Sequence, residues 1–251
     1  MFSARGQQHS ACDLPTLGRV ISASITHDSV RITRMRPLLL GHRGSRCSRT
    51  TSENTFAAFD LALEHECDGF EFDVRLTSDG VAVVCHDARF RRISISRGAA
   101  SRVPELPTLE AVLDRYSARA FLDIELKVAG LEPQVHQLLS RYPPKKGVVV
   151  SSFLPKVLLE LRRIDASIRL GLICGNRRQL RRWRELPIDY VIAQHTLISW
   201  RLIREAHEAE KKVFVWTVNR PAAMLRFANW GADGLITDRT DLVALTFDSA
   251  C

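Results

Sequence analysis

Four short segments place acidic, basic or imidazole groups at the ends of predicted β-strands. They are Gly41–Gly44 (GHRG), Glu71–Asp73 (EFD), His86–Asp87 (HD) and Glu125–Lys127 (ELK). Residues two apart in a strand share a face, so Glu71 points with Asp73 and Glu125 points with Lys127. Buried charges are costly unless they are paired or bound to a metal. Three carboxylates, two histidines, an arginine and a lysine therefore indicate a site for a cation and a phosphate group.

The acidic residues are the kind of ligand that a hard divalent cation prefers, because such cations bind oxygen. The six cysteines contain no Cys-x-x-Cys pair, which argues against a zinc site. Scattered cysteines in a chain of this size are typical of reduced thiols in a cytosol. We therefore expect a cytoplasmic protein that uses an oxygen-ligated cation.

Short apolar runs alternate with amphipathic stretches from residue 38 onward. The runs predict nine strands, at residues 38–40, 69–74, 81–85, 121–126, 148–150, 170–174, 190–193, 213–218 and 234–237. Helices are expected at 55–66, with Asn54 as N-cap, and at 109–116, with others beginning near 131, 155, 176, 199 and 221. Strands that alternate with helices predict a parallel sheet with helical crossovers.

Nine strands are one more than an eight-stranded α/β barrel needs. The link between Val74 and Val81 is too short for a parallel crossover, and its Asp79-Gly80 pair is a hairpin signal. The sequence therefore predicts a (β/α)8 TIM-type barrel with an added hairpin strand after strand 2. A doubly wound open sheet would need a glycine-rich fingerprint after its first strand, and GHRG is not one. Barrel active sites lie at the carboxyl ends of the strands, where the charged segments fall.

The net charge is +8, with 30 arginines and 6 lysines. The densest basic stretch is Arg177–Arg184, which we interpret as a solvated helix face with Leu180 and Trp183 turned inward. No nucleic-acid-binding signature accompanies it, so we expect no specific nucleic-acid partner. No apolar run is long enough to span a membrane, although the positive charge leaves peripheral lipid contact open. The sequence does not determine the oligomeric state.

Residues 1–36 show no steady periodicity and differ in composition from the rest. We expect them to form an N-terminal extension that is either disordered or upstream of a true start at Met35. The expected barrel domain covers residues 37–251.

Several further segments occur in a characteristic order with the four charged ones. They are Glu53-Asn54-Thr55, Ala57-Ala58-Phe59, Thr77–Gly80, Ser151-Ser152-Phe153, Trp216–Asn219 and Gly231–Asp238. Taken together, these motifs resemble the glycerophosphodiester phosphodiesterase family. Ser52 stands where that family commonly has proline, the loop 44–53 is long and basic, and the stretch between His86 and Glu125 is short.

The resemblance implies an enzyme that uses Mg²⁺ or Ca²⁺ to hydrolyse glycerophosphodiesters to sn-glycerol 3-phosphate and an alcohol. It implies that Glu71, Asp73 and Glu125 hold the metal, that His42 and His86 are the acid-base pair, and that Arg43 and Lys127 contact phosphate. Histidine suits both proton transfers because its pKa lies near neutrality. The position of Trp216 near the barrel mouth suggests a pocket wall for glycerol or the leaving group.

Two alternatives stay open from the sequence. One is a lysophospholipase D-like activity on lipid phosphodiesters, and the other is a barrel that binds a phosphorylated ligand without catalysis. Some polar residues of the motifs are expected to be structural. Asp87 orients a histidine or caps a turn, Asn54 begins a helix, Asp123 makes a buried contact, and Asn219 and Asp238 belong to loops or caps.

Overall fold

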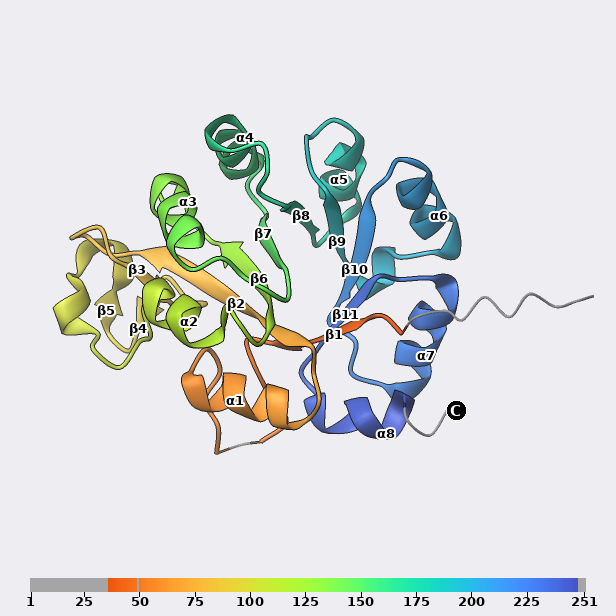
Figure 1. Ribbon diagram of the computed structural model, residues 1–251, viewed down its shortest axis with the longest axis horizontal. Helices are drawn as coiled ribbons and strands as arrows, with labels where there is room; N and C mark the ends of the chain where they lie inside the picture. The colour runs from red at the N-terminus through yellow and green to blue at the C-terminus, as the bar shows by residue number, and fades with distance from the viewer. Residues whose placement is uncertain (1–35, 49, 248–251) are drawn as a thin grey trace, which may run out of the picture. The chain divides into compact units, whose positions relative to one another are not determined.

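Eight parallel strands close into a barrel because the first strand pairs with both the second and the last. The structure is a computed structural model that describes residues 36–48 and 50–247. Strand β1 (Leu38–His42) pairs with β2 (Gly69–Leu76) and with β11 (Gly234–Thr237). The strands between them are β6 (Phe121–Leu126), β7 (Val148–Ser152), β8 (Leu170–Cys174), β9 (Tyr190–Gln194) and β10 (Lys212–Trp216). The expected (β/α)8 barrel is confirmed (Figure 1).

The ninth strand, β3 (Ala82–Val84), pairs antiparallel with β2 as the hairpin signal predicted. Gly80 has φ of +80° in the connecting turn, a conformation that glycine adopts without steric cost. After β3 the chain forms a small hairpin that the sequence did not predict, β4 (Arg89–Phe90) with β5 (Ile93–Ser94). Two 3₁₀ turns follow it, η1 (Ile95–Arg97) and η2 (Ala100–Arg102).

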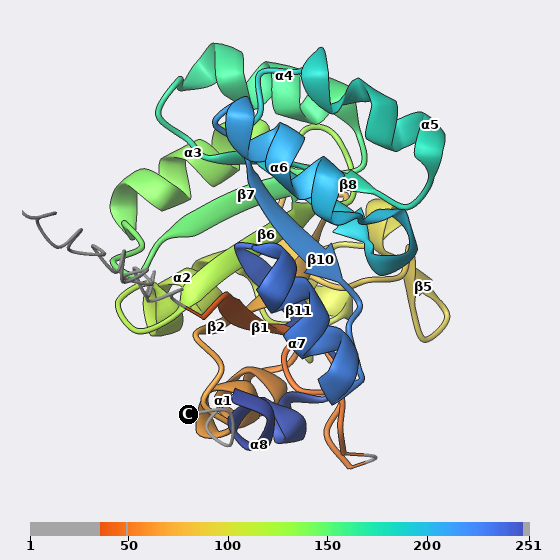
Figure 2. The same ribbon diagram turned by 90° about the vertical axis from the view of Figure 1, so that its right-hand side faces the viewer.

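Helices follow the strands and lie outside the barrel (Figures 1 and 2). They are α1 (Phe56–Glu64), α2 (Leu109–Tyr116), α3 (Glu132–Arg141), α4 (Pro155–Ile164), α5 (Arg177–Leu180), α6 (Trp200–Glu208), α7 (Pro221–Trp230) and α8 (Val243–Phe247). The remaining 3₁₀ turns are η3 (Arg181–Arg184), η4 (His195–Leu197) and η5 (Thr240–Leu242). Within the described residues, no helix combines the length and apolarity needed to cross a membrane.

The start of α1 corrects one expectation. Thr55, not Asn54, is its N-cap, because the Thr55 hydroxyl accepts a hydrogen bond from Ala58 N. Asn54 instead has φ of 57° and directs its side chain to Asp73. At α2, Thr108 caps the helix as expected, with its hydroxyl accepting from Ala111 N.

The basic stretch Arg177–Arg184 divides into α5 and η3. Trp183 is buried and Leu180 packs against the core, while the arginines of the stretch are exposed. The interpretation of this stretch as a solvated face over two apolar residues is confirmed. The expected extension at residues 1–36 falls outside the described residues except for Arg36, whose guanidinium bonds to Asp68 at 2.9 and 3.2 Å.

Alternation along β2 decides which side chains reach the barrel interior. Phe70 and Phe72 pack outward against α1 and α2, where Phe59 stacks on Phe70 at 4.2 Å between ring centroids and Tyr116 meets Phe70 edge-on. Glu71 and Asp73 must then point inward, because successive strand residues face opposite sides. The aromatic packing outside the barrel therefore holds the carboxylates inside it.

Replacing Phe59 with alanine tests this packing. Phe59 is fully buried, so Phe59→Ala should lower the free energy of unfolding by about 3–5 kcal/mol through lost burial and a cavity. Urea unfolding followed by circular dichroism measures the change. The control is Leu159→Ala, at a side chain that is 49% exposed, which should stay within about 0.5 kcal/mol of the wild type. Equal stability of the two variants would contradict the packing account.

Candidate active site

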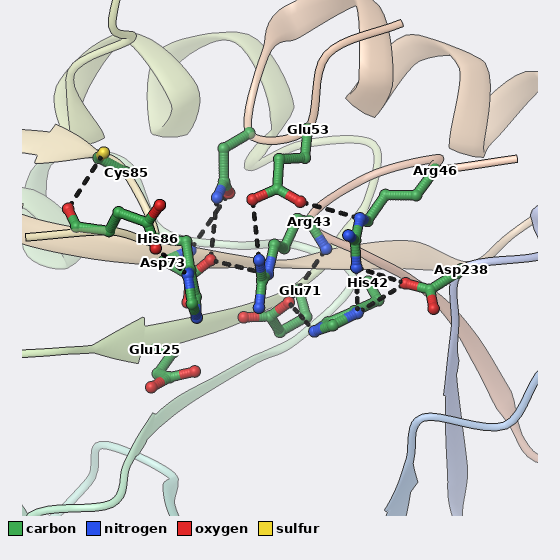
Figure 3. Close-up of polar contacts among 12 residues, drawn as sticks. His42, Arg43, Arg46, Glu53, Glu71, Asp73, Cys85, His86, Glu125 and Asp238 are labelled. Atoms are coloured by element: carbon green, nitrogen blue, oxygen red, sulfur yellow. Dashed lines mark hydrogen bonds and ion pairs between the residues drawn. The ribbon is translucent and has the colours of Figure 1, made fainter. Parts of the chain in front are cut away.

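The predicted site residues meet at one end of the barrel because strand register brings them side by side. His42 is in register with Glu71, and Asp73 is in register with Glu125. Lys127 follows β6 directly, and its backbone N–H donates to the Val74 carbonyl. Figure 3 shows the carboxylates of β2 and β6 directed toward the same space as His42 and His86.

Glu71, Asp73 and Glu125 each offer an oxygen within 4.8 Å of the others. The three side chains are buried. The Lys127 ammonium lies 2.7 Å from Glu125 Oε1 and 3.2 Å from Asp73 Oδ1, whereas Glu71 Oε1 has no hydrogen-bond donor among the described residues. Three buried carboxylates that share one ammonium and leave one oxygen without a donor fit a divalent cation that prefers oxygen ligands.

The pKa values of the three acids show that the cluster is short of positive charge. Burial raises the pKa of Glu71 well above its usual value, and the charges of Asp73 and Glu125 raise it further. Burial and Asp73 also raise the pKa of Glu125 to about 7. Burial opposes ionisation of Asp73 as well, but Lys127 and Arg43 outweigh it, so the pKa of Asp73 lies below its usual value. A bound cation would relieve the repulsion that remains.

Arg43 connects the acidic cluster to the loop after β1. Its backbone N–H donates to Glu71 Oε2 at 3.0 Å, and its guanidinium lies 3.3 Å from Asp73 Oδ2 and 2.8 Å from Glu53 Oε1. Arg43 has φ of 59°, a conformation uncommon outside glycine. Asn54 Nδ2 donates to the same oxygen, Asp73 Oδ2, at 2.9 Å, while the Lys127 ammonium contacts Asp73 Oδ1, so both oxygens of Asp73 are held.

His42 is held by a residue from the last strand. Its Nδ1 lies 2.8 Å from Asp238 Oδ1, and Asn219 Nδ2 donates to the other oxygen of Asp238 at 2.8 Å. Arg46 also donates to Asp238 Oδ1 at 2.9 Å and pairs with Glu53 at 2.8 Å (Figure 3). Burial would raise the pKa of Asp238, but the bonds from His42 and Asn219 outweigh it and lower that pKa to about 2. Asp238 is therefore an anion that anchors the His42 ring.

His86 arrives on the segment that follows the added strand. Its Nδ1 lies 2.8 Å from Asp87 Oδ1, and its carbonyl accepts two hydrogen bonds from Arg75, at 2.9 and 2.7 Å. Arg75 belongs to β2, the strand that also carries Glu71 and Asp73. Its guanidinium therefore fixes the backbone of His86 relative to these two carboxylates.

A pocket of about 110 Å³ lies between these groups. One part of it is lined by polar residues, which are His42, Arg43, Glu71, His86, Asp123, Glu125 and Lys127. The rest of its wall is apolar and comes from Phe153, Ile173, Ile192, Trp216 and Ile236. Trp216 meets Phe153 edge-on and donates its Nε1–H to the Ile192 carbonyl at 3.2 Å, so the indole is fixed.

Asp123 lies deeper in the barrel, as the sequence suggested. It accepts a hydrogen bond from Ser151 Oγ at 2.5 Å, and burial raises its pKa to about 7. The cluster of three acids does not include it.

Sequence reasoning missed the supporting residues of the site. We expected Asp238 and Asn219 to be loop or cap residues and Asn54 to begin a helix, yet they bond to His42, Asp238 and Asp73. A signal was present, because each belongs to one of the ordered motifs. Their partners lie up to 196 residues away in sequence, so local patterns do not reveal the contacts.

The chain is similar in sequence to known proteins of one family. The chain matches the sequence profile of the Glycerophosphoryl diester phosphodiesterase family over residues 42–122 and 105–242. YhdW of Bacillus subtilis (strain 168), provisionally named a glycerophosphodiester phosphodiesterase, is 32% identical over 82% of this chain and 96% of its own. The glycerophosphodiester phosphodiesterase of Caldanaerobacter subterraneus subsp. tengcongensis is 30% identical over 81% of this chain and 95% of its own.

Solved structures of similar proteins share the barrel. A glycerophosphodiester phosphodiesterase from Parabacteroides distasonis superposes with a TM-score of 0.76 at 22% identity, over 86% of this chain and 99% of that one. An Oleispira antarctica phosphodiesterase, solved with its product sn-glycerol-3-phosphate, superposes with a TM-score of 0.74 at 22% identity, over 85% of this chain and 97% of that one. By its profile match, its relatives and its barrel, this chain belongs to the glycerophosphoryl diester phosphodiesterase family, a family of phosphoric diester hydrolases.

Proposed function

We propose that this protein hydrolyses glycerophosphodiesters to sn-glycerol 3-phosphate and an alcohol. The observation that carries the proposal is the convergence of three buried carboxylates, each with an oxygen within 4.8 Å of the others, beside two histidines and the cations Arg43 and Lys127. The names of the curated relatives and the product bound to the Oleispira antarctica enzyme support the substrate class.

We infer that Glu71, Asp73 and Glu125 hold Mg²⁺ or Ca²⁺, the hard cations that their oxygens suit. When bound, the cation supplies charge neutralisation at the phosphoryl oxygens. Lys127 and Arg43 line the same pocket and add two positive charges at its acidic end. We infer that these two residues contact and orient the phosphate, which leaves phosphorus open to attack.

His42 and His86 carry the two proton transfers in this proposal. Each ring has Nδ1 held by a carboxylate, Asp238 or Asp87, so Nε2 is left to exchange a proton with the substrate. One histidine takes the proton of the glycerol 2-hydroxyl as its oxygen attacks phosphorus, and the other gives a proton to the departing alcohol oxygen. The cyclic phosphate that results is then opened by water, which gives sn-glycerol 3-phosphate. The fixed indole of Trp216, together with Phe153, forms a wall for glycerol or the alcohol.

We further infer a cytoplasmic location for the enzyme. Cys47, Cys67, Cys85 and Cys174 are free thiols, which is usual in a reducing compartment.

Removing the metal or one of its carboxylates tests the cation site. Treatment with chelator should abolish release of sn-glycerol 3-phosphate, and added Mg²⁺ or Ca²⁺ should restore it. Glu71→Gln should weaken metal binding measured by calorimetry and lower turnover by about a hundredfold or more, because it removes a charged ligand. The control is Glu132→Gln, a buried glutamate on α3 that is not in the cluster. Full activity after thorough chelation would refute the site.

Replacing either histidine tests the proton transfers. His42→Ala and His86→Ala should each lower kcat for a soluble glycerophosphodiester by about a hundredfold or more, the usual cost of losing a general acid or base. Circular dichroism should show the folded protein in both cases. His136→Ala, on the outer helix α3, should keep wild-type turnover. Near-normal kcat in both site variants would mean that other groups move the protons.

Asp238→Asn tests the anchor of His42. The amide keeps the size of the side chain but removes the negative charge that His42 Nδ1 and Arg46 share. We expect kcat to fall by about tenfold to a hundredfold while KM changes little, because Asp238 orients a proton-transfer group and does not line the pocket. Asp241→Asn, which removes the partner of Arg239, is the matched control. A change in KM alone would assign Asp238 to substrate binding instead.

A further inference from the structure

Exposed arginines without ion pairs lie on the helices and connections that follow β8, β9 and β10. The six residues are Arg177, Arg178, Arg181, Arg201, Arg220 and Arg226, and we call them the basic rim. All six are exposed, and none forms an ion pair within residues 36–48 and 50–247. Neighbouring arginines farther along the same elements do, since Arg184 pairs with Glu205 at 2.6 Å and Arg204 with Glu208 at 3.5 Å.

Topology places the basic rim at the open end of the barrel. Helix α5 begins three residues after β8 ends, η4 follows β9 directly, and Arg220 precedes α7 in the connection from β10. In this fold such connections lie at the carboxyl ends of the strands, the end that holds the site. Helices α5 and α6 are neighbours in both views (Figures 1 and 2).

The arginines surround two surface hollows. Arg177, Arg181 and Arg201 line a hollow of about 430 Å³ between α5 and α6, together with the apolar residues Leu180, Leu197 and Leu202. The carboxylate in its lining, Glu205, is already bonded to Arg184. His195, Arg220 and Arg226 line a second hollow of about 600 Å³, which contains no carboxylate among its lining residues.

Trp200, at the start of α6, adds an exposed aromatic side chain to this surface. It is 46% exposed, and the other exposed large apolar side chains of the described residues are both leucines. The Arg201 and Arg204 guanidiniums lie 5.4 and 5.1 Å from the centroid of the Trp200 ring. Tryptophan beside arginine is enriched where a protein meets the interface of a membrane with water.

We propose that the basic rim and Trp200 dock the open end of the barrel onto an anionic phospholipid surface. Unpaired cations spread over three consecutive strand–helix units suit a broad array of phosphates, whereas nucleic-acid recognition commonly inserts one element into a groove. Exposed apolar area beside the cations favours a lipid interface over the wholly polar backbone of a nucleic acid. Ile173, Ile192 and Trp216, in the apolar part of the pocket, lie on β8, β9 and β10, the strands that precede the elements of the basic rim.

Vesicle binding by the full chain tests the docking. The wild type should sediment with vesicles that contain phosphatidylserine and not with vesicles of phosphatidylcholine alone, and added salt should weaken the binding. The triple variant Arg177→Gln/Arg181→Gln/Arg201→Gln should bind about a hundredfold more weakly, since each basic side chain near such a surface strengthens binding by about fivefold.

A second triple variant removes the same charge from the other end of the barrel. Lys145 and Lys146 precede β7, and Lys212 begins β10, so all three lie at the amino ends of strands. Lys145→Gln/Lys146→Gln/Lys212→Gln should keep most of the vesicle binding. Because both variants leave residues 1–35 intact, a difference between them reports on the rim itself.

Three results would overturn the proposal: no sedimentation of the wild type at low salt, equal loss in both triple variants, or retention on duplex DNA without vesicle binding. Trp200 gives an independent readout, because its fluorescence should shift to shorter wavelength with anionic vesicles and the shift should be absent in Trp200→Phe. Sedimentation and fluorescence need no turnover, so their failure is distinguishable from failure of the proposed hydrolysis.

Discussion

The confinement of three carboxylates inside a barrel is the constraint on which the rest of this structure depends. Glu71, Asp73 and Glu125 share a space that their charges alone would make unfavourable. They stay there because the residues between them on β2 and β6 are large and apolar and pack against the outer helices. The packing of these apolar side chains outside the barrel therefore fixes the carboxylates inside it, and Arg43 and Lys127 balance part of their negative charge.

The two histidines are supported in different ways. His42 is fixed by Asp238, whose second oxygen is bonded to Asn219, so the last part of the barrel holds a residue of the first strand. His86 depends on a neighbour, Asp87, and on the clamp that Arg75 places on its carbonyl. Closure of the barrel between β1 and β11 is thus part of the chemistry, because it brings Asp238 to His42.

The mouth of the barrel divides into two halves with different chemistry. The first part of the barrel, from β1 to β6, supplies Glu71, Asp73, Glu125, the two histidines and their paired cations, whereas β7 to β11 supply the apolar wall of the pocket. Positive charge on the first half is neutralised by carboxylates, and positive charge on the basic rim is not. This difference is the basis on which we assign one phosphodiester to the pocket and an array of lipid phosphates to the basic rim.

Sequence alone determined the barrel and the added strand, and it pointed to the charged residues that the structure gathers at one end of the barrel, but not to the apolar wall formed by Ile173, Ile192 and Ile236. Successive side chains of a strand point to opposite faces, so the apolar residues beside Glu71 and Asp73 are enough to predict that these two point inward. The short link that contains Asp79-Gly80 likewise predicts the antiparallel hairpin of β2 and β3. Tertiary structure decided the partners. Asn54 bonds to Asp73 instead of capping α1, Asp238 reaches His42 across 196 residues, and Arg46 joins Glu53 to Asp238. Such contacts depend on barrel closure and on the course of one loop, and no local pattern of residues encodes a distance between segments so far apart in the chain.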